Sequence, residues 1–171
     1  MSRILFVTWD GGGNLPPATA LAHELARRGH SVRFLGHATQ AAQLRAEGFE
    51  WVPPQHARSF DRSRDYHPLR MLSVFADTGL GHDLLEAVAE RPTDLVVVDS
   101  FMFGAMDAAR RAGVRYAVLE HMYAAAYRSG ILGGPMGLNL RVRRLRPQLA
   151  LDAAGLRLLM TLPELDPAPA V

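Results

Sequence analysis

The chain has 171 residues, of which 49% are hydrophobic and 21% charged, so it is long and apolar enough for one globular domain with a sizeable core. It has a formal net charge of +2 and no cysteine, and all 19 basic residues are arginine, which excludes disulfides and thiolate metal sites and gives no sign of a nucleic-acid partner. No stretch reaches the ~18 apolar residues of a membrane span and the N-terminus does not resemble a signal peptide, so we expect a cytoplasmic protein.

The first third of the chain alternates apolar runs with helical patterns. The run at 4–8 (ILFVT) shows no alternation, which favours a strand buried on both faces. Three glycines and Asn14 then break the run, and a helix is expected at 18–28, ended by Gly29. The next expected elements are a strand at 32–35, a helix at 39–47 ended by Gly48, and a strand at 49–52.

The rest of the chain is less regular, but it continues the same alternation. The clearest strand is the buried run LVVV at 95–98. The other expected elements are a polar loop at 56–67, a helix at 69–90 interrupted near Gly79 and Gly81, a helix at 101–112 ended by Gly113, a strand at 116–119, a glycine-rich loop at 129–137, a helix at 138–149 broken near Pro147, and a strand at 156–161.

Strands that alternate with helices predict an α/β fold with a doubly wound parallel sheet, Rossmann-like in architecture. In such a sheet the ligand crevice lies beyond the carboxyl ends of the strands. That rule selects the loops that follow Thr8, Leu35, Val98 and Leu119. We expect one domain over residues 1–162, and a proline-rich tail at 163–171 that is the start of an interdomain linker or a frayed terminus.

The glycine loop at 11–13 is compared first with nucleotide-binding fingerprints. An NAD site needs a third spaced glycine and an acidic residue about 20 positions on, but the second strand ends in Gly36 and His37. A Walker phosphate loop needs a lysine, and the chain has none. The loop still presents backbone N–H groups beside a helix N-terminus, where a polar or anionic ligand could approach. A tight turn without a ligand is the alternative.

Three phrases of the sequence resemble family 1 glycosyltransferases of the GT-B fold, in particular actinobacterial enzymes that glycosylate natural products. The first phrase is ILFVTWDGGGNLPPATALAHELARRGHSVRFLG, which opens the chain. The others are TDLVVVDSFMFGAMDAARRAGVRYAVLEH and LMTLPELDPAPA, the last of which precedes the crossing into the second domain in that family. Lipid-linked cell-wall glycosyltransferases share a similar opening, so the resemblance specifies the fold more closely than the substrate.

This resemblance implies that the chain is the N-terminal, acceptor-binding domain of a hexosyltransferase-type enzyme. The small-molecule aglycone would bind this domain. The nucleotide-sugar donor, a co-substrate and not a cofactor, would bind mainly a C-terminal domain that this chain does not include. The chain alone is then expected to be inactive, and no metal is expected to be needed.

Many members of the family use a histidine in the first loop as general base and an aspartate after the fourth strand to orient it. Asp99 matches that aspartate, with capping of the following helix as its alternative role. The histidine has no match, because counting back from His30 places Asn14 in its position, and an amide accepts no proton at neutral pH. Asn14 would then position the acceptor, another residue would be the base, or the protein would lack activity. The other candidate bases are Asp10, His37, His82 and His121.

An acceptor pocket for a flat apolar aglycone favours aromatic and methionine side chains beside a loop of small residues. The better candidates are the two clusters at strand ends. The residues expected to bind substrate are Gly12, Gly13, Phe75, Phe101, Met102, His121, Met122 and Tyr123, with Trp9 and Phe103 beside them. A non-catalytic module that binds an aglycone or a partner protein is the second interpretation, and a dinucleotide-dependent oxidoreductase is the third.

Overall fold

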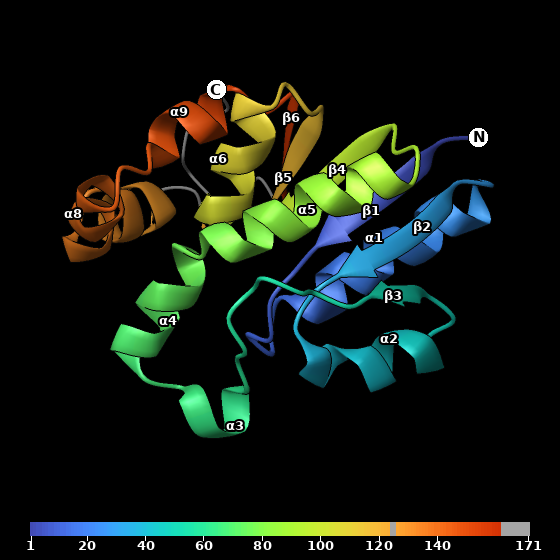
Figure 1. Ribbon diagram of the computed structural model, residues 1–171, viewed down its shortest axis with the longest axis horizontal. Helices are drawn as coiled ribbons and strands as arrows, with labels where there is room; N and C mark the ends of the chain where they lie inside the picture. Colours follow the sequence, from blue (N-terminus) through green and yellow to red (C-terminus); the bar gives the residue numbers. More distant parts are fainter. Residues whose placement is uncertain (124–125, 162–171) are drawn as a thin grey trace.

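The computed structural model describes residues 1–123 and 126–161. Its centre is a six-stranded, all-parallel sheet with the strand order β3-β2-β1-β4-β5-β6 (Figure 1). This is the doubly wound, Rossmann-like order in which strands are added outward on both sides of the first, so the predicted fold class is confirmed. The strands are β1 Arg3–Val7, β2 Ser31–Leu35, β3 Glu50–Val52, β4 Leu95–Asp99, β5 Tyr116–Glu120 and β6 Leu156–Leu159.

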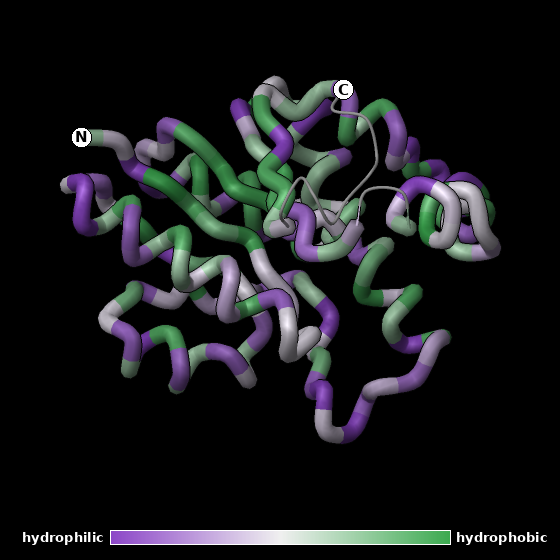
Figure 2. Tube along the Cα trace, turned by 180° about the vertical axis from the view of Figure 1, so that it is seen from behind, coloured by the Kyte–Doolittle hydropathy of each residue, from purple (hydrophilic) through white to green (hydrophobic). Residues whose placement is uncertain are grey.

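Helices cover both faces of the sheet (Figure 1). The central strands β1 and β4 are apolar at every position except the terminal Arg3 and Asp99, because alternate side chains enter two separate cores. Leu5 and Val7 pack in one core with residues of α4, α5, α6 and α9, while Ile4 and Phe6 pack in the other with α1 and α2. The central strands are mostly green, the colour of hydrophobic residues, in Figure 2. The helices are α1 Leu15–Arg27, α2 Ala41–Ala46, α3 Arg62–Asp65, α4 Pro68–Phe75, α5 Thr78–Glu90, α6 Phe103–Arg111, α8 Pro135–Val142 and α9 Pro147–Asp152, with a 3₁₀ turn at Ala38–Gln40 and a π-helix at Tyr127–Leu132.

The register of the strands brings the four selected loops to one edge of the sheet. Val7 is aligned with Leu35 on one side and with Val98 on the other, and Asp99 is aligned with Leu119. The loops after β1, β2, β4 and β5 therefore open on the same crevice side, as the parallel arrangement requires.

The interruption expected near Gly79 and Gly81 was placed wrongly. The pattern at 69–90 forms two helices, and the break lies at 76–77, where the carboxylate of Asp77 accepts a hydrogen bond from the Gly79 backbone N–H at 2.9 Å and caps α5. The glycines are inside α5, where they allow close packing. A Cβ on Gly79 would meet the His56 carbonyl.

The loop expected at 129–137 was also wrong. This segment forms the π-helix and the start of α8, and the helix expected at 138–149 is divided between α8 and α9. Glycine here serves close packing and not a turn, because a Cβ on Gly137 would collide with the Leu132 carbonyl. The short helix α3 also lies within the loop expected at 56–67. The boundary at 162 and the linker expected at 163–171 lie outside the described residues.

Candidate active site

Asp99 is the centre of a hydrogen-bonded cluster at the carboxyl edge of the sheet. It ends β4 and is 2% exposed. Its Oδ2 atom accepts a hydrogen bond from Asn14 Nδ2 at 2.8 Å and lies 2.7 Å from His121 Nε2. Its Oδ1 atom accepts from the Phe101 backbone N–H at 2.9 Å. The structure therefore brings together Asp99 and two residues that the sequence placed in separate loops. The alternative role of Asp99 as helix cap was wrong, because α6 begins with Met102 as its N-cap and Asp99 bonds the turn before it.

Asn14 closes the loop after β1 and joins it to β4. Its Nδ2 atom donates a second hydrogen bond to the Trp9 carbonyl at 2.9 Å, and its Oδ1 atom accepts from the Gly11 N–H at 3.1 Å. Asn14 is 6% exposed and makes no capping bond to α1. Because both amide hydrogens are engaged by protein acceptors, the side chain holds the loop and Asp99 together.

His121 reaches the same carboxylate from the loop after β5. Its side chain is 11% exposed. The Nδ1 atom is buried and has no hydrogen-bond partner among residues 1–123 and 126–161. A buried polar atom without a partner costs about 1–3 kcal/mol, and Ser100 Oγ and Glu120 Oε2, which adjoin Asp99 and His121 in the sequence, are in the same state.

The other candidate bases belong to different surroundings. His37 is 2% exposed, burial lowers its pKa, and its Nδ1 atom accepts a hydrogen bond from the Asp10 N–H at 3.2 Å. The carboxylate of Asp10 accepts from the Arg62 N–H at 3.2 Å. His82 lies exposed on α5, with its ring edge-on to that of His56. Of these four candidates, His121 is the one that contacts Asp99.

A buried layer beneath His121 was missed by the sequence analysis. Glu120 is fully buried, and its Oε1 atom pairs with Arg157 Nε at 2.5 Å across β5 and β6. Tyr127 donates its hydroxyl hydrogen to the Ser100 carbonyl at 2.5 Å, and burial raises its pKa well above the usual 10. These contacts join segments 27 and 37 positions apart, and no local pattern in the sequence signals them.

The expected acceptor-binding side chains divide by exposure. Phe75, Met102 and Phe103 are at most 2% exposed and belong to the core, where Phe75 stacks on Phe101 with ring centroids 4.8 Å apart. Phe101 and Met122 are half-buried against that core, and Tyr123 is 48% exposed. A ligand could therefore contact Phe101, Met122 and Tyr123, whereas Phe75, Met102 and Phe103 are closed off in the core.

The glycine loop differs from position to position. Gly12 has a φ of +83°, which favours glycine, and a Cβ there would meet the side chain of Arg62. Gly13 has no atom near the place where a Cβ would stand. Arg62, which the sequence analysis did not select, therefore lies over the loop at Gly12 while Gly13 is open.

Comparison with known proteins now adds the family. Residues 12–163 match the sequence profile of the glycosyl transferase 4-like domain. The chain belongs to this glycosyltransferase family. It is 28% identical over 167 residues to 4'-demethylrebeccamycin synthase of Lentzea aerocolonigenes, an alignment that covers 85% of this chain and 39% of that protein.

Solved structures show the same fold in glycosyltransferases. The glycosyltransferase of kitacinnamycin matches with a TM-score of 0.69 at 20% identity, over 98% of this chain and 48% of that one. The calicheamicin glycosyltransferase CalG4 matches with a TM-score of 0.67 at 20% identity, over 98% of this chain and 50% of that one. Arabidopsis thaliana UGT89C1, complexed with UDP-L-rhamnose, matches with a TM-score of 0.72 at 17% identity, over 97% of this chain and 46% of that one. The domain thus has the fold of the N-terminal half of GT-B glycosyltransferases, as the sequence predicted, and it spans about two fifths of the curated relative and about half of each structure.

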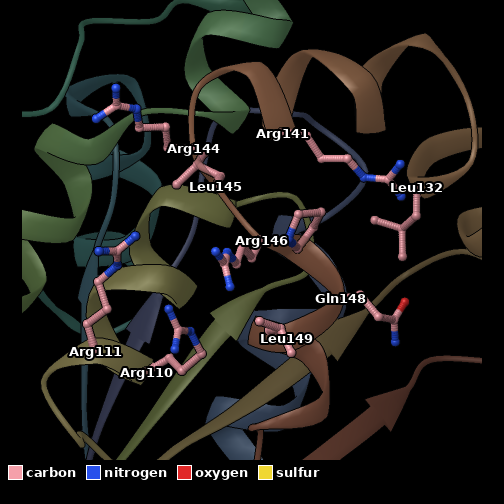
Figure 3. Close-up of a pocket in the computed structure, with 10 residues that line it drawn as sticks. Arg110, Arg111, Leu132, Arg141, Arg144, Leu145, Arg146, Gln148 and Leu149 are labelled. Carbon is pink, nitrogen blue, oxygen red and sulfur yellow. The ribbon is translucent and has the colours of Figure 1, made fainter.

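A groove of about 820 Å³ lies on this glycosyltransferase domain, and the Asp99 cluster is not among the residues that line it. Arginine side chains reach it from α6 and from the α8–α9 connection (Figure 3). Arg110 and Arg111 lie at the end of α6 opposite to Asp99, about 12 Å along the helix from Phe103, and both pair with Asp107. The lining arginines are Arg110, Arg111, Arg141, Arg144 and Arg146.

One group of side chains has the composition of a metal site. Ligand atoms of His56, Asp83 and Glu86 lie within 4.8 Å of one another. The two carboxylate oxygens of Asp83, however, accept hydrogen bonds from the backbone N–H groups of Gln55, His56 and Ala57 at 2.8–2.9 Å. The carboxylate therefore fixes the turn after β3.

Within the described part of the chain, none of the helices combines the length and hydrophobicity that a membrane span requires.

Proposed function

We propose that this domain is the acceptor-binding half of a glycosyltransferase that moves a hexose from a nucleotide-sugar donor to a small natural-product aglycone. The observation that carries the proposal is the Asp99 cluster, where a buried carboxylate orients polar groups from two other loops at the carboxyl edge of the sheet. Membership of a glycosyltransferase family and the likeness to 4'-demethylrebeccamycin synthase support it.

The chemistry that such a site would serve is the attack of an acceptor oxygen on the anomeric carbon of the donor. A neutral hydroxyl is a weak nucleophile, so proton removal by a positioned group accelerates the step by ~10²–10⁴-fold. A buried carboxylate that fixes an imidazole supplies that positioning. The half-buried Phe101 and Met122 and the exposed Tyr123 lie next to the cluster in sequence and would receive the apolar part of the aglycone.

The donor would be bound mainly by a second domain. The relatives are about twice as long as this chain or more, and the apolar side chains next to the Asp99 cluster are of the kind that would suit an acceptor. A non-catalytic binding module is the second candidate function, favoured by the amide of Asn14 at the position where related enzymes carry their base.

The proposal is tested by ligand binding to the 171-residue chain with ¹³C-methyl-labelled methionine. A panel of planar aglycones, namely alizarin, quercetin and 4-methylumbelliferone, is titrated while the methyl signals of Met122 and of Met106, which is fully buried, are followed. We expect at least one aglycone to shift the Met122 signal and to leave the Met106 signal in place. UDP-glucose alone should shift neither signal.

Two results would contradict the proposal. One is the failure of every aglycone to bind. The other is tight binding of UDP-glucose without an acceptor, which would assign the crevice to the donor.

A further inference from the structure

The position of the expected base is occupied by a side chain that cannot act as one. Asn14 has both amide hydrogens engaged, one with the Trp9 carbonyl and one with Asp99. An amide also takes up no proton at neutral pH. A glycosyl transfer at this site needs its base from elsewhere, and the same carboxylate already carries an imidazole.

We infer that His121 is the general base of the proposed transfer, acting through Nδ1, and that Asp99 is its positioning residue. This inference rests on the proposed function. It places the base on the loop after β5 instead of the loop after β1.

The geometry assigns the two ring nitrogens different tasks. His121 Nε2 lies 2.7 Å from Asp99 Oδ2, and a carboxylate only accepts hydrogen bonds, so the shared hydrogen is on Nε2. The lone pair of the neutral ring is then on Nδ1. This is the logic of a hydrolase triad, in which the carboxylate fixes the tautomer and stabilises the imidazolium that forms.

Nδ1 is also one of the buried polar atoms that lack a partner among the described residues, as are Ser100 Oγ and Glu120 Oε2 beside the cluster. It is buried, and no described residue donates a hydrogen bond to it. The rest of the ring is not sealed, because 11% of the side chain is exposed. An acceptor hydroxyl that donates to Nδ1 would supply the missing hydrogen bond and would have its proton at the base in the same contact.

Asn14 has a defined part in this arrangement. Its Nδ2 atom donates to the same Oδ2 atom that holds the imidazole. A histidine at position 14 would compete with His121 for that oxygen. The amide instead donates to the carboxylate beside the imidazole and leaves one imidazole on Asp99.

The proposed reaction moves one proton to His121 and one glycosyl group to the acceptor. The acceptor O–H bond breaks and its proton goes to Nδ1, which gives an imidazolium paired with Asp99. The oxygen lone pair forms a bond to the anomeric carbon of the nucleotide sugar. The bond between that carbon and the phosphate oxygen breaks, and the nucleoside diphosphate leaves with the electron pair. The imidazolium later releases its proton to water.

The first test uses phenols whose phenolates absorb at longer wavelength, namely 4-methylumbelliferone and alizarin. Each is bound to the 171-residue chain at a pH where the dissolved phenol is mostly neutral. We expect the phenolate fraction of the bound phenol to rise at least ~5-fold above that of the dissolved phenol. His121→Gln should abolish the rise while binding changes less than ~3-fold, Asp99→Asn should reduce it, and His82→Gln, a change at an exposed histidine, should leave it unchanged.

The second measurement needs no variant to fold. The ¹⁵N signals of the His121 ring in the wild-type chain should show hydrogen on Nε2 and a bare Nδ1 at neutral pH. Hydrogen on Nδ1 would overturn the inference. So would a phenolate rise that persists in His121→Gln, or bound phenols that stay neutral, although aglycone binding would then still support the acceptor half. If no aglycone binds, the proposed function fails and the inference fails with it.

Discussion

Asp99 accepts hydrogen bonds from three groups, and Asp99→Asn keeps one of these contacts and changes the other two. The remaining oxygen still accepts from the Phe101 N–H, but an NH₂ group now faces Asn14 and His121. His121 can satisfy that group only by accepting at Nε2, which puts its hydrogen on Nδ1. We expect glycosyl transfer in a two-domain protein that contains this chain to fall ~10²-fold or more, while unfolding free energy falls by only ~1–2 kcal/mol.

The measurement for Asp99→Asn is the transfer rate at a temperature where circular dichroism shows the variant to be folded. Were the folded fraction to work at the normal rate, Asp99 would be a cap for the turn at Phe101 and no more.

Asn14→Ala tests the loop connection. The substitution removes the hydrogen bonds to the Gly11 N–H and to Asp99, whereas the Trp9 carbonyl keeps the donor Gln40 Nε2 at 2.9 Å. We expect a loss of ~1–2 kcal/mol in unfolding free energy, the scale of one or two buried hydrogen bonds, measured by urea denaturation. A stability equal to the wild type with a large loss of aglycone binding would show instead that the amide faces the ligand.

The site could be predicted from sequence as far as strand ends determine it. Asp99 and His121 follow neighbouring parallel strands and Asn14 follows the first, so their approach to one edge was derivable. The pairing of Glu120 with Arg157 was not, because each side chain is an ordinary strand residue until β5 and β6 are adjacent. The burial of Phe75 and Met102 was also missed, because the same apolar residue types occur at the rim of a pocket and in a core. Which of the two they occupy depends on the segments that pack around them.

Helix α6 closely approaches the start of α5 at Gly104. A Cβ on this residue would collide with the backbone of Asp77 at the start of α5. Gly104→Ala should therefore destabilise the domain by ~1–3 kcal/mol, the cost of overpacking. Gly130→Ala is the matched control, because nothing lies within 4 Å of its Cβ position. Urea denaturation of both variants checks this, and equal stabilities would mean that the helices can separate without cost.

The contact between β5 and α9 has a pH dependence. Tyr116 donates its hydroxyl hydrogen to the Ala150 carbonyl, and burial raises the pKa of Tyr116 to about 12. In the unfolded chain the same group titrates near 10. Its contribution to stability is therefore complete below pH 10 and is lost as the pH rises from 10 towards 12.

Tyr116→Phe should lower unfolding free energy by ~1 kcal/mol at pH 7 and reduce the decline in stability above pH 10. Denaturation with urea at pH 7 and pH 11 provides the comparison. Tyr66→Phe, at a residue that is 64% exposed, should change neither value. If the unfolding free energy of Tyr116→Phe fell above pH 10 as much as that of the wild type, Tyr116 would not be the cause of the decline.

Helices and strands could be predicted from the sequence wherever a local pattern was sufficient, such as an apolar run for a strand or a glycine at a helix end. The unbroken apolar runs gave β1 and β4, and the glycines after α1, α2 and α6 have the positive φ that ends a helix. The glycine pattern failed at 129–137, where Gly130 and Gly137 lie within helices and a Cβ on Gly133, Gly134 or Gly137 would meet a backbone carbonyl. A glycine permits either a turn or a close approach of another backbone. Which of the two occurs depends on the segments that pack around it.

In the whole enzyme, the proposal assigns acceptor binding to this domain and donor binding to a second domain, so the 171-residue chain alone should lack one of the two functions. Donor orientation and stabilisation of the leaving diphosphate are large contributions to glycosyl transfer, and the proposal assigns both to the second half of the enzyme. The 171-residue chain should therefore bind an aglycone and yet form no glycoside when UDP-glucose is added.

Chromatography of chain, UDP-glucose and alizarin after prolonged incubation is the measurement, with the Met122 methyl signal as the control that the aglycone is bound. Binding without product is the expected pair of results. Product formation at the 1–10³ s⁻¹ typical of complete enzymes would show that these residues bind and activate the donor by themselves. The loops around Asp99 would then have to bind both substrates, and a one-domain transferase would replace the acceptor-half proposal.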